Sequence, residues 1–211
     1  MESTHLYLIR HGQSEGNAAL RFGGHSPTPL SALGHLQAEA TAKYLAKKRI
    51  AAIYSSDLPR CLQTAEPLAK ILNLEIQTSA ALRERNVGVL QGLTFDEARM
   101  RFPEDFAALA SRNIDFMMSG GESYRQMIDR AAGKLEEILA WHAGESIAVF
   151  SHTGTIGFLI LHLLGALNSL PARFIWIATK NCGITHFEFR REGELSLLRS
   201  VNNTRHLQGL Q

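Results

Sequence analysis

Short runs of consecutive apolar residues alternate along this chain with segments in which apolar residues recur every three or four positions. The runs are LYLI at 6–9, AAIY at 51–54 and IAVF at 147–150. They are continuous rather than alternating, which is typical of strands that are covered on both faces. Helical spacing lies between and after them, over 31–48, 60–72, 122–141 and 153–165. Strands that alternate with helices predict the α/β class, here a three-layer α/β/α sandwich with a mostly parallel central sheet.

Two of these helices carry more specific expectations. In the segment 31–48, Leu33, Leu36, Ala40 and Tyr44 fall on one face, which we expect to be buried, and Ser31 is the predicted N-cap. In the segment 60–72, Pro67 is expected to bend or interrupt the helix, because proline lacks the backbone N–H that the helix needs.

Two stretches depart from this rhythm. GITHFEFR (183–190) and ELSLLRSV (194–201) alternate in part, and they predict two strands joined by a turn at 191–193. The segment 85–121 contains several glycines and a proline with short helical pieces between them, so it predicts a helical excursion from the sheet that forms a small lid. We expect residues 1–211 to form a single domain that includes this lid.

Composition narrows the class of protein further. The chain has 211 residues, is 45% hydrophobic and 20% charged, and carries a net charge of only +2. This balance excludes global disorder, and the scattered basic residues favour no nucleic-acid and no membrane partner. No apolar run reaches the length of a membrane span or signal peptide, and Cys61 and Cys182 are far apart, as expected of reduced structural thiols. We therefore expect a cytoplasmic protein.

Chemically active side chains gather where the three predicted parallel strands end. Arg10, His11, Gly12, Ser14 and Asn17 follow the first strand; Ser55, Ser56, Asp57 and Arg60 follow the second; Ser151, His152, Thr153 and Gly154 follow the third. Ligands of open parallel sheets bind beyond the carboxyl ends of the strands, so these side chains are expected to meet. Two arginines beside two histidines would repel one another unless an anion lies among them.

The anion that this arrangement favours is a phosphate. Guanidinium groups match pairs of phosphate oxygens, and the backbone N–H groups of Thr153 and Gly154 would add a helix N-terminus. Phosphate binding alone does not require two imidazoles. Their presence indicates catalysis, because a neutral histidine held in one tautomer can attack phosphorus. Glu84, at the root of the predicted lid, is the candidate proton donor for the leaving oxygen.

These residues carry a resemblance to a known family. LIRHGQSEGN resembles the RHG signature of the histidine phosphatase superfamily, in its phosphoglycerate mutase-like branch. PLSALGHLQA, IYSSDLPRCLQTA, LRERNVGVLQG, GGES and FSHTG are similar to further motifs of that family, in the same order along nearly the whole chain. Motifs that match in this order are far more specific than the tripeptide alone.

The resemblance implies a role for each matching position. His11 would be the nucleophile that becomes phosphohistidine, and Arg10, Arg60 and His152 would hold the phosphoryl group. Glu84 would be the acid and then the base. Gln13, Ser14, Asn17, Gly23, Gly24 and the backbone of Thr153 would line the substrate site. The same resemblance implies no cofactor, no metal, a small phosphorylated substrate as partner and a possible homodimer.

Three functions stay open at this stage. LRERNVGVLQG resembles the glycolytic mutases more than most phosphatases of the family. The segment 95–121 is short, however, and Arg112 has no adjacent arginine, which favours a phosphomonoester hydrolase over a cofactor-dependent phosphoglycerate mutase. An inactive phosphate-binding module is a third interpretation, and the presence of His11, Glu84 and His152 speaks against it. No nucleotide-binding glycine motif is present.

Overall fold

The computed structural model describes residues 3–111, 113–167, 176–190 and 195–210, and these form an α/β sandwich. The described strands make one six-stranded sheet in the order β3-β2-β4-β1-β5-β6. Their bounds are β1 Thr4–Arg10, β2 Ile50–Ser55, β3 Ile76–Thr78, β4 Ser146–Ser151, β5 Ile184–Phe189 and β6 Leu197–Asn203. Strands β1 to β4 are parallel, whereas β5 and β6 run antiparallel to their neighbours. The predicted mostly parallel sheet is confirmed.

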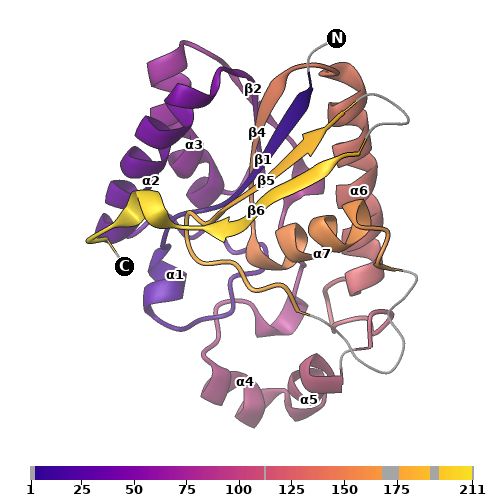
Figure 1. The fold of residues 1–211 in the computed structure, drawn as a ribbon. Coiled ribbons are helices and arrows are strands. Elements are labelled where there is room, and N and C mark those ends of the chain that lie inside the picture. The colour runs from indigo at the N-terminus through magenta and orange to yellow at the C-terminus, as the bar shows by residue number, and fades with distance from the viewer. Residues whose placement is uncertain (1–2, 112, 168–175, 191–194, 211) are drawn as a thin grey trace.

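Helices cover both faces of the sheet. Helices α2 (Ala32–Leu45) and α3 (Pro59–Leu72) lie on one face, and α6 (Tyr124–Trp141) and α7 (Thr153–Leu163) lie on the other (Figure 1). Strand β1 contributes to both cores, because Leu6 and Leu8 join the cluster under α6 and α7 while Tyr7 and Ile9 join the cluster under α2 and α3. This double coverage is the reason that the strand is apolar at consecutive positions.

The expected buried face of α2 is wrong. Leu36 is 51% exposed, and the residues of α2 that are buried are Gly34, Gln37, Ala38, Thr41, Ala42 and Leu45. Small residues let the two helices approach closely, so a stripe of alanine, glycine and threonine is buried in preference to the more hydrophobic leucine. The N-cap is confirmed, since the Ser31 hydroxyl accepts a hydrogen bond from the Gly34 N–H.

Pro67 does not interrupt α3, which runs without a break from Pro59 to Leu72. The helix tolerates the missing N–H because its other face is anchored in the core by Cys61, Ala65 and Leu68, all 0% exposed. Strand β3 was not predicted from the sequence; it has three residues at the edge of the sheet, too few for a recognisable pattern. The predicted turn at 191–193 falls outside the described residues.

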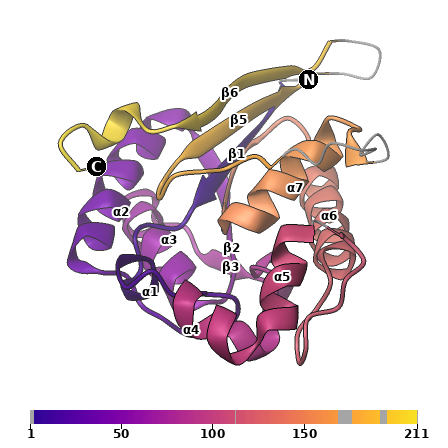
Figure 2. The same cartoon turned by 90° about the horizontal axis from the view of Figure 1, so that it is seen from below.

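The segment 85–121 leaves the sheet as predicted. It contains α4 (Phe95–Arg101) and α5 (Pro103–Ser111), which lie with the short α1 (Glu15–Ala18) at the end of the molecule where the parallel strands end (Figures 1 and 2). A small apolar cluster around Val87, Leu90, Ala98 and Met118 holds the excursion together. Its action as a lid stays a prediction.

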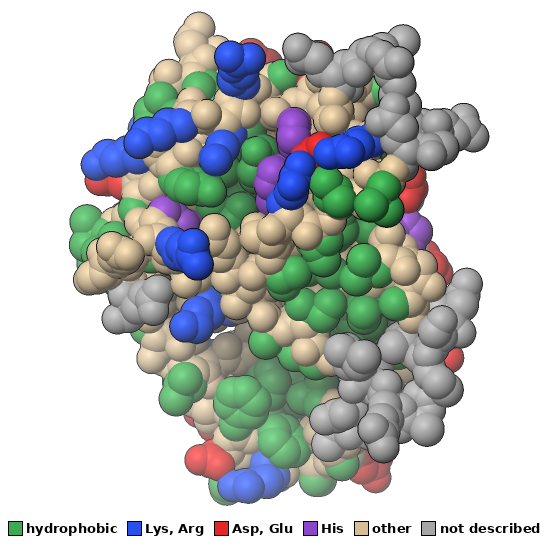
Figure 3. Space-filling view, viewed as in Figure 1, with side chains coloured by type: hydrophobic (Ala, Val, Ile, Leu, Met, Phe, Trp, Pro, Cys, Tyr) green, Lys and Arg blue, Asp and Glu red, His purple; other side chains and the backbone are tan. Residues whose placement is uncertain are grey.

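Two surface features bear on the expected partners. Lys and Arg side chains are spread in separate groups over the face shown in Figure 3 and form no continuous basic stripe there. Within the described ranges, no helix combines the length and the apolar character needed to cross a membrane.

Candidate functional site

His11 lies directly after β1 and is only 4% exposed. Its Nδ1 lies 2.7 Å from the Gly12 carbonyl oxygen, which can only accept, so Nδ1 carries the proton and Nε2 keeps a free lone pair. Burial lowers the pKa of His11 well below its usual value, and the charges of Arg60 and Arg10 lower it further. The ring is therefore neutral at neutral pH, in the tautomer that a nucleophile attacking through Nε2 requires.

His152, the N-cap of α7, is completely buried beside His11, with the ring centroids 5.2 Å apart. Its Nδ1 lies 3.2 Å from Arg60 Nη2, which can only donate, so Nε2 carries the proton and donates to the Ser56 hydroxyl at 2.9 Å. Burial lowers the pKa of His152 well below its usual value, followed by the charge of Arg60. Both imidazoles are neutral in this arrangement.

Two arginines surround the histidines. Arg60, in the first turn of α3, is 2% exposed and donates through Nη1 to the Ser26 carbonyl and through Nη2 to the Gly24 carbonyl. Arg10 donates through Nη1 to the Thr179 carbonyl, while its buried Nε has no partner among the described residues. Burial lowers the pKa of each guanidinium from its usual value, although both remain charged at any physiological pH. A buried donor without a partner is typical of a site that binds an anion.

Glu84 reaches the same site from the loop after β3. One carboxylate oxygen accepts from the Gly154 N–H at 3.0 Å, and the other accepts from the Thr155 N–H at 3.2 Å. A Cβ at position 154 would lie 2.5 Å from Glu84 Oε1, so only glycine permits this approach. The carboxyl group is thereby fixed at the N-terminus of α7, close to His152.

This contact corrects one expectation. The Gly154 N–H was expected to bind the phosphate together with that of Thr153, but it is occupied by Glu84. The N-terminus of α7 is therefore occupied by the protein's own carboxyl group, that of Glu84, in place of the expected phosphate. The hydroxyl of Thr153 accepts from the Thr179 N–H and hydroxyl, and the Thr153 backbone N–H stays a candidate phosphate donor.

The remaining predicted substrate residues fall into two groups. Gly23 and Gly24 lie against Arg60, in a loop whose carbonyls it binds. Ser14 and Asn17 instead form the reciprocal capping box of α1, and Gln13 accepts a hydrogen bond from Ser31. Asn17 also accepts from Asn181, which donates to the His11 carbonyl as well, so α1 is tied to the segment behind His11.

Several contributors to the site were not among the predicted site residues. They are Ser56, Thr64, Thr179 and Asn181, together with His25, Glu122 and Arg130 around the backbone of Glu84. Ser56 was expected at the end of the second strand but without a role, and Thr64 lies in the same IYSSDLPRCLQTA segment, where closer attention to that motif would have found it. The others come from distant parts of the chain and have no local signal. Across the described ranges, no group of three or more His, Cys, Asp or Glu side chains could hold a metal ion.

Comparison with known proteins agrees with this geometry. The chain belongs to the histidine phosphatase superfamily, whose branch 1 model matches residues 6–204. It is 39% identical over 168 residues to a metal-independent phosphoserine phosphatase of Arabidopsis thaliana, covering 78% of this chain and 71% of that protein. It is 30% identical over 186 residues to a probable phosphoglycerate mutase GpmB of Serratia proteamaculans, covering 88% and 85%.

A solved structure shows the same architecture over nearly the whole length. The phosphoserine phosphatase of Entamoeba histolytica, solved as a mutant in complex with phosphoserine, has a TM-score of 0.79 and 29% identity. The match covers 97% of this chain and 99% of that one. The family expected from the sequence motifs and the α/β sandwich are both confirmed.

Proposed function

We propose that this chain is a metal-independent phosphomonoester hydrolase that acts on a small phosphorylated metabolite through a phosphohistidine at His11. The observation that carries the proposal is the state of His11: its Nδ1–H is bound to the Gly12 carbonyl, and its Nε2 lone pair is free beside the buried guanidinium of Arg60 and the half-buried one of Arg10. A binding module needs the cations but has no use for a neutral imidazole locked in one tautomer.

In the first step, Nε2 of His11 forms a bond to phosphorus as the bond from phosphorus to the leaving alcohol breaks. The alcohol oxygen takes a proton from the carboxyl group of Glu84. Arg10 and Arg60 carry hydrogen-bond donors for the equatorial oxygens, where charge is spread in the transition state. The Nε2–H of His152, which donates to the Ser56 hydroxyl in this structure, would turn to a phosphoryl oxygen when the substrate binds. The unpartnered Nε of Arg10 is available for this without breaking any existing contact.

In the second step, water replaces the imidazole. The Glu84 carboxylate takes a proton from the water as its oxygen bonds to phosphorus, and the electrons of the N–P bond return to Nε2. One group serves as acid and then as base, so Glu84 must stay in the same place through both steps. Its two backbone donors from α7 hold it there.

The acceptor in the second step separates a phosphatase from a mutase. The short excursion 85–121 favours water as the acceptor, because a longer insertion would be needed to enclose the phosphohistidine. A phosphoserine phosphatase among the relatives supports hydrolysis, whereas the relative named as a probable phosphoglycerate mutase favours isomerisation as the second candidate. A cytoplasmic location and a homodimer stay predictions.

The test is phosphate release from p-nitrophenyl phosphate in EDTA, compared between wild type, His11→Ala and His35→Ala. His35 is an exposed histidine of α2 and serves as the matched control. We expect turnover in wild type and the control, and at least a ~10³-fold loss of kcat in His11→Ala, since the covalent step is then removed. Quenching the wild type with labelled substrate in alkaline detergent should trap a phosphoprotein that loses its label in acid, and His11→Ala should lack it.

The alternatives predict different results. A silent wild type that interconverts the phosphoglycerates would establish the mutase. Turnover that survives in His11→Ala would overturn the phosphohistidine mechanism, and a wild type without either activity would establish a binding module.

A further inference from the structure

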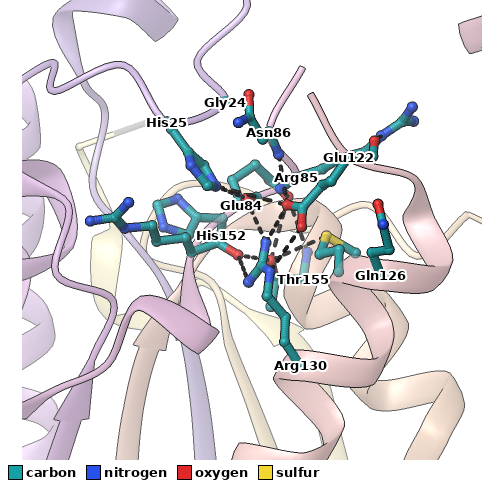
Figure 4. Close-up of polar contacts among 12 residues, drawn as sticks. Gly24, His25, Glu84, Arg85, Asn86, Glu122, Gln126, Arg130, His152 and Thr155 are labelled. Atoms are coloured by element: carbon teal, nitrogen blue, oxygen red, sulfur yellow. Dashed lines mark hydrogen bonds and ion pairs between the residues drawn. The ribbon is translucent and has the colours of Figure 1, made fainter. Parts of the chain in front are cut away.

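Three side chains outside the predicted site surround the segment that carries Glu84. His25 comes from the loop beside Arg60, Glu122 precedes α6, and Arg130 lies in α6 (Figure 4). Two donors meet at the Glu84 carbonyl oxygen, the His25 Nε2 at 2.8 Å and the Arg130 Nη2 at 2.9 Å. The carboxyl group of Glu84 is held by the backbone of α7. These two donors form a second, separate set of contacts, which holds the backbone of Glu84.

Arg130 holds the segment that carries Glu84. Besides the Glu84 carbonyl, its Nη1 donates to the carbonyls of Ala81 at 2.7 Å and Arg83 at 2.9 Å. Three carbonyls of one four-residue segment are thereby bound to a single guanidinium group. The planar, five-donor fork of arginine is suited to this arrangement, and the single ammonium of lysine is not.

Glu122 orients this fork. Its carboxylate accepts from Arg130 through Nε at 3.1 Å and through Nη2, and it also accepts from the Asn86 N–H at 2.8 Å. The side chains of Glu122 and Arg130 are 16% and 23% exposed, so their charges neutralise each other in a largely dry setting. The pair therefore fixes the chain on both sides of Glu84.

His25 connects this segment to the phosphate-binding arginine. Since the Glu84 carbonyl can only accept, Nε2 of His25 carries the proton. The loop that carries His25 is bound through its Gly24 and Ser26 carbonyls to the guanidinium of Arg60. A continuous set of hydrogen bonds thus runs from Arg60, through the loop and His25, to the backbone of Glu84.

We propose that His25, Glu122 and Arg130 are positioning residues that hold the proton donor Glu84 at a fixed place relative to Arg60. This inference rests on the proposed function, because it takes Glu84 as the acid. It adds that the acid is placed by two independent supports, α7 at the carboxyl group and the cluster of His25, Glu122 and Arg130 at the backbone. Loss of the cluster should weaken proton donation while the nucleophile and its arginines remain in place.

Substrates whose leaving groups differ in acidity separate a positioning role from a purely structural one. A structural defect lowers kcat/KM equally for all of them, whereas a misplaced acid lowers it most for the leaving group that needs a proton. The p-nitrophenolate ion leaves without a proton, whereas unsubstituted phenol and p-methoxyphenol leave more easily when a proton is supplied. For an enzyme with a phosphorylated intermediate, kcat/KM reports only the steps up to its formation. We therefore compare kcat/KM for p-nitrophenyl, phenyl and p-methoxyphenyl phosphate.

The variants are Glu84→Gln as the reference, then Arg130→Met, Arg130→Lys, His25→Leu and His25→Gln. In Glu84→Gln and Arg130→Met, we expect kcat/KM to fall at least ~10-fold more for p-methoxyphenyl phosphate than for p-nitrophenyl phosphate. This difference is a part of the rate enhancement that a general acid supplies. His25→Leu should show the same selective loss to a smaller degree, and His25→Gln should restore it, because the glutamine amide can donate to the Glu84 carbonyl. Arg130→Lys should resemble Arg130→Met, since lysine lacks the fork.

Arg125→Gln is the matched control, because Arg125 lies in α6 but pairs with Asp115 at the exposed surface. It should leave all three rates within twofold of wild type. Should Arg130→Met fail to fold, His25→Leu still decides, as its side chain is 24% exposed and its loop has other anchors.

The outcomes separate the two proposals. A selective loss in Glu84→Gln without one in Arg130→Met or His25→Leu overturns the positioning role and leaves the proposed function intact. Equal losses on all three substrates in Arg130→Met and His25→Leu would likewise show a general structural role. If Glu84→Gln itself shows no selective loss, Glu84 is not the acid and the proposed function fails at that step.

Discussion

At the scale of single residues, this site depends on which hydrogen-bond partners each group has. The Gly12 carbonyl sets the tautomer of His11, and the Arg60 guanidinium sets that of His152. Burial is the largest cause of the lowered pKa of each histidine, and the charge of Arg60 is the second. The sequence alone shows the neighbouring arginines but not the burial. The two rings are therefore neutral mainly because they are dry.

Gly154 offers a test of how closely Glu84 must approach α7. We predict that Gly154→Ala lowers kcat by about 100-fold, because a Cβ would lie 2.5 Å from Glu84 Oε1 and push the carboxyl group out of reach of the leaving oxygen. The measurement is kcat with p-methoxyphenyl phosphate, together with thermal unfolding.

Gly133→Ala in α6 is the control, since its Cβ would meet nothing within 4 Å. It should keep full activity and raise the free energy of unfolding by about 0.5–1 kcal/mol, as alanine does in a helix. Wild-type activity in Gly154→Ala would show that the close contact with Glu84 is dispensable.

At the scale of elements, tertiary packing overrides local preference in the helices on one face of the sheet. Helix α2 buries Ala38 and Ala42 at 0% and 1% exposure while Leu36 stays 51% exposed, and α3 continues through Pro67. Packing of these two helices against each other and against the sheet outweighs two local preferences: the preference of leucine for the interior in α2, and the tendency of proline to break a helix in α3.

Pro67→Ala should therefore stabilise the protein. Alanine restores a helical hydrogen bond and removes a steric clash, which outweighs the greater freedom of the unfolded chain and gives a net gain of about 1–2 kcal/mol. Urea unfolding followed by circular dichroism measures this.

Pro103→Ala is the comparison, because Pro103 is the first residue of α5, where no N–H is needed. This variant should lose up to about 1 kcal/mol instead. A loss of stability in Pro67→Ala would mean that the proline fits α3 better than its missing hydrogen bond suggests.

At the scale of the whole molecule, several histidines are neutral because they are wholly or partly buried. Burial lowers the pKa of His11 and His152 well below the usual value, and it lowers the pKa of His186, on β5, to about 4. In the unfolded chain each of them takes up a proton near pH ~6.5. Below that pH the unfolded state binds more protons than the native state, so stability present at neutral pH is lost as the pH falls.

We predict that the free energy of unfolding decreases between pH 7 and pH 5. The slope is up to about 1.4 kcal/mol per pH unit for each histidine that is protonated only when unfolded. The carboxylates titrate near or below pH ~4 when unfolded, so they contribute little in this window. Urea unfolding at pH steps of one half measures the slope.

His186→Gln should lower this slope by up to about 1.4 kcal/mol per pH unit, which is the contribution of one proton. A flat profile in wild type would show that the histidines titrate alike in both states, which contradicts their burial.

Much of the fold and the centre of the site could be predicted from the sequence. Consecutive apolar residues predict strands covered on both faces, and the residues that follow three of them include Arg10, His11, Arg60 and His152, which the structure brings together. Glu84 needed the family motif as well, because a lone carboxylate between two arginines has no distinctive local pattern.

The sequence by itself determined the three central strands, the helices that cover them and which chemical groups stand at their carboxyl ends, because hydrophobic periodicity and motif spacing are local properties of the chain. Only the tertiary structure decided which face of α2 is buried, that Glu84 occupies the Gly154 N–H, and that His25 and Arg130 meet at one carbonyl. These contacts join segments dozens of residues apart, and their partners are chosen by packing and by the need to satisfy buried polar groups, neither of which leaves a periodic trace in the sequence.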